Sequence, residues 1–496
     1  MRGFPLLRAS SGAPVLFLAA ATVALGTAPR VACAADDRPP NVVLVVIDTL
    51  RSDHLGCYGY ERGTSPFIDE LAAEGVLFEH CYSAASWTFP ACMSILSGLL
   101  PIVHGCECGT ERLSEAIVTL PQYLARQGYY CAGVVSNPHL DRAFGFARGF
   151  HDYDDRTAFV QASAGLFRAD AAPTHEQVND IVTGNVVTQR AVSLLGNAVK
   201  RDQPFFLFVL YFDPHDSYVP PARYVERFDK GYDGPMDGTN VAALRGRPPA
   251  KRDLEHLVAR YDGEIAYVDD QLRRLVEAVD RVARDETITI VVSDHGEAFG
   301  EHGHMLHGNG VHREEMWTPM IWRAPGRIAS GRRVREPVSN LDVLATLAEM
   351  VPIRNPRPYQ GRSLAPALRG DPLAPAPVLG LRSRPAVATM RHVVVADDRF
   401  RLHARFEHSP LAEGAVNQLF DIAKDPWERN PIVDRHQTSA LRMRRALDET
   451  WRASARLYEQ YQSEAPTTAA RPDKVARRHI ESVGYMAGRL PGRCGG

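Results

Sequence analysis

The sequence predicts an α/β protein with a large, mostly parallel central sheet flanked by helices and a smaller C-terminal α+β subdomain. Three features indicate this fold class: long apolar runs rich in β-branched residues, amphipathic helical patterns between them, and a change of pattern after a proline-rich stretch. Strands that alternate with helices form parallel sheets with helices on both faces. We expect the main domain at 38–352 and the C-terminal subdomain at 378–490.

Four runs that are apolar or β-branched nearly throughout predict the central strands, because a strand covered on both faces shows little polar alternation. They are Asn41–Ile47, 130–136, Phe205–Tyr211 and Thr287–Ser293. The clearest helix between them has apolar residues at steps of three and four, the period of an amphipathic helix. These residues are Leu257, Tyr261, Ile265, Val268, Leu272, Leu275 and Val279.

Prolines crowd the stretch 353–377 and predict a linker or surface loop there. Beyond it, 392–396 and 399–403 predict a short hairpin, and 441–461 predicts a helix.

The first 34 residues, 1–34, predict a secretory signal peptide. Arg2 and Arg8 precede an apolar run over 15–25, and Ala32-Cys33-Ala34 offers small residues at a cleavage point. The run is short for a membrane span, and an uncleaved anchor is the alternative. We therefore expect a secreted or periplasmic protein with no stable membrane span in the mature chain.

The composition of the 496 residues is that of a globular protein, with 45% hydrophobic and 23% charged residues. The net charge of -2 offers no electrostatic attraction for nucleic acid. Seven of the eight cysteines follow the signal peptide, so at least one thiol stays free even if disulfides form. Cys106 and Cys108 lack a second pair at zinc-finger spacing, which favours a structural or disulfide role. Nothing in the pattern predicts an oligomeric state.

Polar side chains directly follow two of the predicted strands. Asp48 comes after the first strand, and Asp294 and His295 come after the last. Alone, each residue would be an ordinary loop or capping residue. Because the carboxyl ends of parallel strands form a common crevice, we expect the three side chains to converge. Two carboxylates and an imidazole suit one divalent cation.

Several segments resemble the sulfatase family of the alkaline-phosphatase superfamily and follow that family's order. They are VVIDTLRSDHLGCYG (45–59), SWTFP (86–90) running into Gly98, DPHDSY (213–218), SDHGEAFGEHG (293–303), MWTPMIWRAPG (316–326), LFDIAKDPWERN (419–430) and Val483-Gly484-Tyr485. The resemblance implies an alkaline-phosphatase/sulfatase-like fold, with 38–352 as the catalytic domain.

Carried over residue by residue, the resemblance implies one divalent metal ion bound by Asp48, Thr88, Asp294 and His295. It also implies that Thr88 is the nucleophile, that His215 touches the substrate, and that His307 lies beside the transferred group. An imidazole with few carboxylates favours Mn²⁺ or Zn²⁺, and Ca²⁺ is the alternative because members of the family use it.

Three positions depart from the family's pattern. Thr88 stands ten residues before Gly98, where sulfatases have the cysteine that is oxidised to formylglycine, and no cysteine is in that register. Cys92 replaces the arginine that steadies formylglycine, and Thr49 stands where many sulfatases have a second metal-binding aspartate. Direct attack by the Thr88 hydroxyl, as in the phosphate-ester branches of the superfamily, is the chemistry that these residues favour.

Thr88 has a second interpretation as the N-cap of a helix over 90–97, because threonine is a favoured N-cap and proline is tolerated in a first turn. The residues around it favour the nucleophile. Glu297 is expected either to cap a helix or to support His295.

The sequence thus predicts a secreted, metal-dependent hydrolase of phosphate or sulfate esters that acts on a small-molecule or glycan ester through a covalent intermediate on Thr88. Phosphate esters are favoured. One alternative is a transferase that passes a phospho group to a sugar or lipid hydroxyl, although the membrane region usual in such enzymes is missing. The other is a catalytically dead sulfatase-like binding protein, which would hold no stoichiometric metal ion.

Overall fold

The computed structural model describes residues 38–155, 183–239, 241–351, 353–382, 391–406, 416–474 and 476–477. The predicted signal peptide 1–34 and Val483-Gly484-Tyr485 lie outside the described residues. Among the helices that are described, none combines the length and the apolar character needed to cross a membrane.

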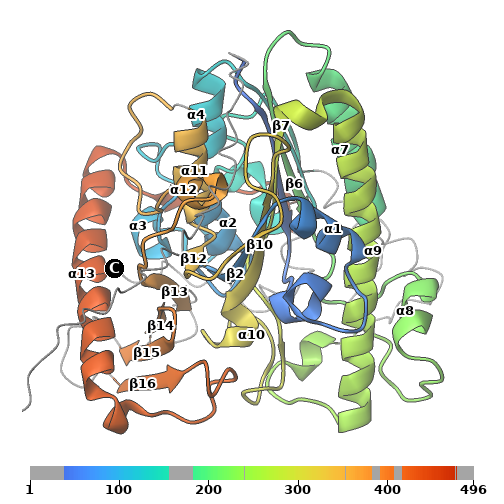
Figure 1. The fold of residues 1–496 in the computed structure, drawn as a ribbon, viewed down its shortest axis with the longest axis vertical. Coiled ribbons are helices and arrows are strands. Elements are labelled where there is room, and N and C mark those ends of the chain that lie inside the picture. The colour runs from blue at the N-terminus through green and yellow to red at the C-terminus, as the bar shows by residue number, and fades with distance from the viewer. Residues whose placement is uncertain are drawn as a thin grey trace, which may run out of the picture. The chain divides into compact units, whose positions relative to one another are not determined.

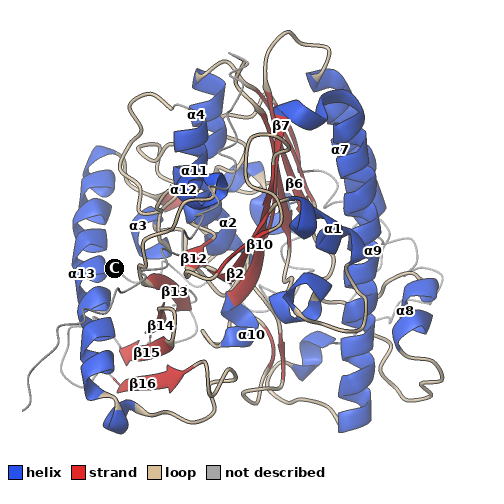
Figure 2. Cartoon of the chain, in the orientation of Figure 1, coloured by secondary structure: helices blue, strands red, loops and turns tan. Residues whose placement is uncertain are grey.

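A nine-stranded sheet forms the centre of the described chain (Figures 1 and 2). Its strands are β1 (Asn41–Ile47), β2 (Val76–Tyr82), β4 (Tyr130–Val135), β5 (Asp152–Asp154), β6 (Phe205–Tyr211), β7 (Thr287–Ser293), β10 (Trp317–Arg323), β11 (Arg332–Val334) and β12 (Val338–Ser339). The order is β11-β2-β10-β7-β1-β6-β4-β5, with β12 also beside β2. Among these strands only β10 runs antiparallel to its neighbours, so the prediction of a mostly parallel sheet is confirmed.

Helices cover both faces of this sheet, as predicted (Figure 2). Along β1, alternate side chains point to opposite faces: Val42, Leu44 and Val46 join one apolar core, while Val43, Val45 and Ile47 join the other. The first core includes side chains of α2 (Thr88–Ser97), α4 (Leu120–Arg126) and α11 (Asp342–Met350). The second includes side chains of α1 (Pro66–Glu74), α7 (Thr183–Ala198) and α9 (Lys251–Ala283).

Shorter elements connect these layers. The short helices are α3 (Pro101–His104), α8 (Ala222–Phe228), α10 (Arg313–Met316) and α12 (Ala365–Arg369), and the short strands are β3 (Glu111–Arg112), β8 (Ala298–Phe299), β9 (Met305–Leu306) and β17 (Thr468–Ala469). The 3₁₀ turns are Ser52–His54, Gly56–Tyr58, Pro138–Leu140, Arg142–Phe144, Val241–Leu244, Arg284–Glu286 and Val433–Arg435.

The parallel register of β1 places the ends of three strands side by side. Ile47 pairs with Tyr211 at the end of β6 and with Ser293 at the end of β7. The residues that follow these strands therefore leave the sheet at one common edge, which is where ligands bind in open α/β sheets.

A four-stranded antiparallel sheet and one long helix form the C-terminal part. The sheet order is β13 (Val378–Arg382), β14 (Arg391–Ala396), β15 (Phe400–Phe406) and β16 (Val416–Asp421), and the helix is α13 (Gln437–Glu464). Strands β14 and β15 form the predicted hairpin, and α13 contains the predicted helix. Met443 and Leu447 of α13 pack against Leu402 and Leu419 of the sheet.

The proline-rich stretch 353–377 differs from a solvated linker. It contains helix α12, and its Leu364 and Leu368 are fully buried in the core that covers the large sheet. Its prolines bend the chain, but the leucines between them supply apolar surface that is stable only when buried. In the N-terminal half of the chain, Cys108 is disulfide-bonded whereas Cys106 is a buried free thiol.

We expect Leu447→Ala to lower the free energy of unfolding by about 2–5 kcal/mol, because it leaves a cavity between α13 and the C-terminal sheet. The matched control is Leu441→Ala in the same helix, where the leucine is 61% exposed and the change should stay within about 0.5 kcal/mol. Urea denaturation of both variants measures the difference. Equal stabilities would contradict the packing of α13 on this sheet.

Candidate active site

Four loops at the carboxyl edge of the large sheet carry the candidate site. Asp48 follows β1, and Asp294 and His295 follow β7, as the sequence indicates. Asn137 comes shortly after β4, and His215 lies in the loop after β6. The parallel strand register thus brings together residues that are far apart in the sequence.

The four predicted metal ligands form one fully buried cluster. Thr88 Oγ1 lies 3.4 Å from Asp48 Oδ1 and 3.2 Å from His295 Nε2. His295 Nε2 lies 3.6 Å from Asp48 Oδ1 and 3.5 Å from Asp294 Oδ2. One ligand atom each from Asp48, Asp294 and His295 lies within 4.8 Å of the others, a spacing that a single ion can bridge.

Helix α2 presents Thr88 to this cluster. The helix begins at Thr88 itself, two residues earlier than predicted, and Trp87 is its N-cap without a side-chain capping bond. The Thr88 hydroxyl makes its contacts with Asp48 and His295 rather than with the first turn of the helix. The interpretation of Thr88 as a helix cap is therefore wrong.

The hydrogen bonds of His295 fit a cation in the cluster. Its Nδ1 lies 2.9 Å from the carbonyl oxygen of Gly296, to which only an N–H can donate. In the neutral ring Nε2 then carries a lone pair, and this lone pair faces the oxygens of Asp48 and Asp294. A lone pair beside two carboxylates is repulsive unless a proton or a metal ion lies between them. The donor set therefore fits a divalent ion.

The charge balance of Asp48 points in the same direction. Burial, together with the charge of Asp294, raises the pKa of Asp48 well above its usual range. Asn137 Nδ2 donates to Asp48 Oδ2 at 2.7 Å and partly offsets this effect. Because metal ligation needs the deprotonated carboxylate, protons and metal ions compete for Asp48, and metal affinity should rise with pH.

His215 and His307 form a second layer next to the cluster. The ring centroid of His307 lies 4.5 Å from that of His295 and 4.9 Å from that of His215. His215 Nδ1 donates to the carbonyl oxygen of Asp216 at 2.6 Å, and burial lowers the pKa of His215, so this ring is neutral near pH 7. His215, Asp216 and His307 also offer ligand atoms within 4.8 Å of one another.

Glu297 orients His307, not His295. Its Oε1 lies 3.0 Å from His307 Nδ1, whereas His295 Nδ1 is taken by Gly296. The expectation that Glu297 caps a helix or supports His295 is therefore wrong. Burial, followed by the charge of Asp216, raises the pKa of Glu297 well above its usual value. A carboxyl with a pKa closer to that of an imidazole shares a proton with it more readily.

The residues that depart from the sulfatase pattern line the same cluster. Thr49 takes a left-handed backbone conformation with φ of 55°, and its N–H donates to Asp294 Oδ1 at 3.2 Å. Cys92 is buried with Sγ 3.8 Å from Asp294 Oδ2, and burial raises the pKa of its thiol well above the usual value. Cys92 therefore stays a neutral thiol beside the carboxylates, where an arginine would have carried a positive charge.

Asn137 is a site residue that the sequence prediction missed. Its Oδ1 accepts from the N–H of His139 at 2.9 Å, which turns its NH₂ group toward Asp48 and places it 3.5 Å from Thr88 Oγ1. The signal was present in the sequence, because Asn137 follows a central strand just as Asp48 and Asp294 do.

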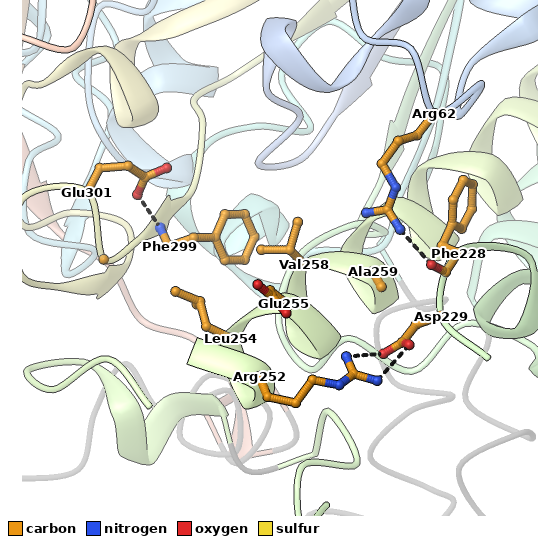
Figure 3. A pocket seen from close by; sticks show the side chains of 11 residues that line it. Arg62, Phe228, Asp229, Arg252, Leu254, Glu255, Val258, Ala259, Phe299 and Glu301 are labelled. Atoms are coloured by element: carbon orange, nitrogen blue, oxygen red, sulfur yellow. Dashed lines mark hydrogen bonds and ion pairs between the residues drawn. The ribbon is translucent and has the colours of Figure 1, made fainter. Parts of the chain in front are cut away.

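A separate cavity of about 580 Å³ lies beside the first half of α9 (Figure 3). Its two arginines are already paired, Arg252 with Asp229 and Arg62 with Asp262. None of the six predicted site residues lines this cavity, and its charges leave no evident preference for an anionic or a cationic ligand.

Comparison with known proteins supports the fold and the family. The family model described as Sulfatase matches residues 40–353, more than half of the chain, and the model described as N-sulphoglucosamine sulphohydrolase, C-terminal, matches residues 300–453. The Delta 4,5-hexuronate-2-O-sulfatase of Bacteroides thetaiotaomicron is 24% identical over 459 residues, which are 84% of this chain and 89% of the relative.

Two solved structures share the fold. A 2-O GAG sulfatase superimposes with a TM-score of 0.67 at 22% identity, covering 89% of this chain and 96% of the other. The phosphonate monoester hydrolase of Agrobacterium radiobacter superimposes with a TM-score of 0.65 at 22% identity, covering 87% of this chain and all of the other.

The fold and these matches define an ester hydrolase of the alkaline-phosphatase superfamily. Within that superfamily, the chain belongs to the sulfatase family. This family is metal-dependent, and the described residues include side-chain groups that could hold a metal ion.

We expect Asp294→Asn to abolish the binding of the active-site ion, because the substitution removes one of the two negative charges in the cluster. Elemental analysis of the metal-loaded protein measures the loss, and circular dichroism checks the fold. The control is Asp269→Asn, a buried aspartate that accepts hydrogen bonds from the N–H groups of Phe67 and Ile68 and lies outside the cluster. Full occupancy of the active-site ion in Asp294→Asn would refute the ligand assignment.

Peptide mass spectrometry should find Thr88 and Cys92 unmodified, because no cysteine occupies the register that sulfatases convert to formylglycine. After denaturation and treatment with iodoacetamide, fragmentation should place a single alkyl group on Cys92 and no modification on Thr88. An aldehyde at Cys92 would overturn the alignment and indicate formylglycine chemistry.

Proposed function

We propose that the chain is a metal-dependent hydrolase of phosphate or sulfate esters in which the hydroxyl of Thr88 attacks the ester directly. The observation that carries this proposal is the position of Thr88 Oγ1, which lies 3.2 Å from His295 Nε2 and 3.4 Å from Asp48 Oδ1 inside the buried cluster. Phosphate mono- and diesters are the favoured substrates, because direct attack by a hydroxyl is the chemistry of the phosphate-ester branches of the alkaline-phosphatase superfamily.

In the first step Thr88 Oγ1 bonds to the phosphorus or sulfur atom, and the bond from that atom to the leaving oxygen breaks. Thr88 passes its proton to Asp48 as it attacks, because its hydroxyl lies 3.4 Å from Asp48 Oδ1. Water then attacks the phosphorylated or sulfated Thr88 and gives a proton to His307, the inorganic anion is released, and Asp48 returns the proton to Thr88 Oγ1. The helix N-terminus at Thr88 points backbone N–H groups toward the oxygens of the transferred group.

His307 is the better of the two candidate proton donors for the leaving oxygen. Its Nδ1 lies 3.0 Å from Glu297 Oε1, so the ring can exchange a proton with this buried carboxyl as it gives one to the leaving oxygen. Nδ1 of His215 lies 2.6 Å from the backbone carbonyl oxygen of Asp216 and 3.1 Å from Oδ1 of its carboxylate, but burial still lowers the pKa of this ring and favours its neutral form. We therefore assign proton transfer to His307 and a hydrogen bond to the substrate to His215.

A divalent ion held by Asp48, Thr88, Asp294 and His295 would supply Lewis-acid stabilisation of the charged ester oxygens and of the Thr88 alkoxide. The ligand set of one imidazole and two carboxylates favours Mn²⁺ or Zn²⁺ over Ca²⁺. A small-molecule or glycan ester is the proposed substrate, and secretion remains a prediction from residues 1–34.

Thr88→Ala should lower kcat by roughly three orders of magnitude or more while KM changes little, because the nucleophile acts mainly in the transition state. Thr88→Ser should keep measurable turnover, since its hydroxyl can still attack. Steady-state kinetics on an aryl phosphate measure both values.

The control is Ser97→Ala in the same helix, whose hydroxyl donates to the carbonyl oxygen of Met93 and does not reach the cluster. Its kcat should stay near that of the unchanged protein. Near-normal kcat in Thr88→Ala would refute the nucleophile assignment, and a protein that holds no stoichiometric metal would favour the catalytically dead alternative.

A panel of four 4-nitrophenyl esters tests the chemical class of the substrate. With the same leaving group on a phosphate monoester, a phosphate diester, a phosphonate monoester and a sulfate ester, we expect the highest kcat/KM for one of the two phosphate esters. Hydrolysis of the sulfate ester alone, abolished in Thr88→Ala, would contradict the preference for phosphate.

A further inference from the structure

A second group of buried histidines lies between the segment 302–316 and the C-terminal sheet. His312 precedes α10, His392 lies on β14 and His403 lies on β15. The ring centroids are 4.7 Å apart for His312 and His403, 5.3 Å for His392 and His403, and 6.0 Å for His312 and His392. Glu428, which follows β16, faces the same group and is 2% exposed.

Several ring nitrogens of this group lack a hydrogen-bond partner among the described residues. They are Nδ1 and Nε2 of His403, Nε2 of His392 and Nε2 of His302. A buried polar atom without a partner costs about 1–3 kcal/mol, and most such atoms in native proteins bind a neighbour, a water molecule or an ion. Unpaired nitrogens on neighbouring buried rings are the kind of atoms to which a water molecule or a metal ion binds.

Glu428 supplies an oxygen donor to the same space. Its Oε1 lies 3.5 Å from His403 Nε2 and accepts from Arg401 Nη1 at 2.7 Å, and its Oε2 lies 3.2 Å from His312 Nδ1. One ligand atom each from His312, His403 and Glu428 lies within 4.8 Å of the other two.

Charges of both signs surround the group. Glu428 pairs with the buried guanidinium of Arg401, Glu314 lies beside His302, and Arg405 and Arg382 act on His392.

We propose that His312, His403 and Glu428, with His392 as a fourth ligand, bind a structural transition-metal ion of the Zn²⁺ type. Imidazole and carboxylate donors in a closed set of four are what structural zinc sites use. Imidazoles that share a tetrahedral ion at Zn–N distances of about 2.0–2.1 Å have ring centres about 5 Å apart, which is close to the measured separations.

The neighbours of the site act on its ligands from outside. His302 stacks on His312 with ring centroids 3.7 Å apart, and His302 Nδ1 lies 2.6 Å from Glu314 Oε1. This contact orients the two rings, as hydrogen-bonded partners of metal ligands do.

The ion would join two parts of the chain that meet at this point. His312 belongs to the segment that carries His307, and the other three ligands belong to the C-terminal sheet or the loop after it. Glu315 accepts hydrogen bonds from the N–H groups of Asn309 and Gly310, so the segment is held together between His307 and His312. The site would thus stabilise the segment without taking part in the reaction.

Zinc stoichiometry of the full-length protein tests the proposal. His403→Phe keeps the ring volume and removes both nitrogens, and we expect it to lower bound Zn²⁺ by one equivalent after equilibration and gel filtration. We expect the same loss when His403→Phe is introduced into the unchanged protein and when it is introduced into Asp294→Asn. The result then does not depend on the ion proposed for the active site. With Zn²⁺ present, His403→Phe should unfold at a lower temperature than the parent protein. Without Zn²⁺, the two proteins should unfold at similar temperatures.

The control is His256→Phe, which removes a buried histidine that is bonded to Asp229 and stacked on Tyr232. Its zinc content should equal that of the parent. If His403→Phe fails to fold, titration of Asp294→Asn with Co²⁺ should show the visible absorption of a tetrahedral site, and His392→Gln should weaken its binding at least about tenfold. Unchanged zinc content in folded His403→Phe, or an Asp294→Asn protein that binds neither Zn²⁺ nor Co²⁺, would overturn the proposal.

Discussion

Two buried carboxylates, Asp48 and Asp294, lie in one cluster at the edge of the large sheet. The groups around them must offset two negative charges that have no contact with solvent. Their proximity follows from the parallel register of β1 and β7, in which Ile47 pairs with Ser293. Burial, followed by the like charge of Asp294, raises the pKa of Asp48. The lone pair of His295 and the hydroxyl of Thr88 complete a donor set that a divalent ion would stabilise.

Elements from both faces of the sheet hold this donor set in place. Helix α2 carries Thr88 from one face, while Tyr261 of α9 donates from the other face to the carbonyl oxygen of Thr49. Asn137 turns its amide toward Asp48 because its oxygen is already used in a 3₁₀ turn. Asn137 and the backbone of Thr49 are thus held by contacts outside the cluster, and such pre-organisation is what electrostatic stabilisation of a transition state requires.

The segment from Asp294 to Glu315 links the candidate active site to the histidine group beside the C-terminal sheet. It begins with Asp294 and His295, continues through Glu297 and His307, and ends near His312, which contacts Glu428. The C-terminal sheet therefore does more than cover apolar surface, because its buried histidines and Glu428 hold the far end of the segment that positions His307.

The sequence by itself determined the fold class, the central strands, the long helices and the three post-strand residues Asp48, Asp294 and His295. Strands and helices are visible in the hydrophobic period of short windows, and residues that directly follow parallel strands share one edge of the sheet. It could not show that α12 packs into the main core, that α2 begins at Thr88, or that Glu297 serves His307 and not His295. Nor could it show that His312, His392, His403 and Glu428 meet. These features depend on which side chains become neighbours once distant segments pack, and burial then sets their charges and hydrogen bonds.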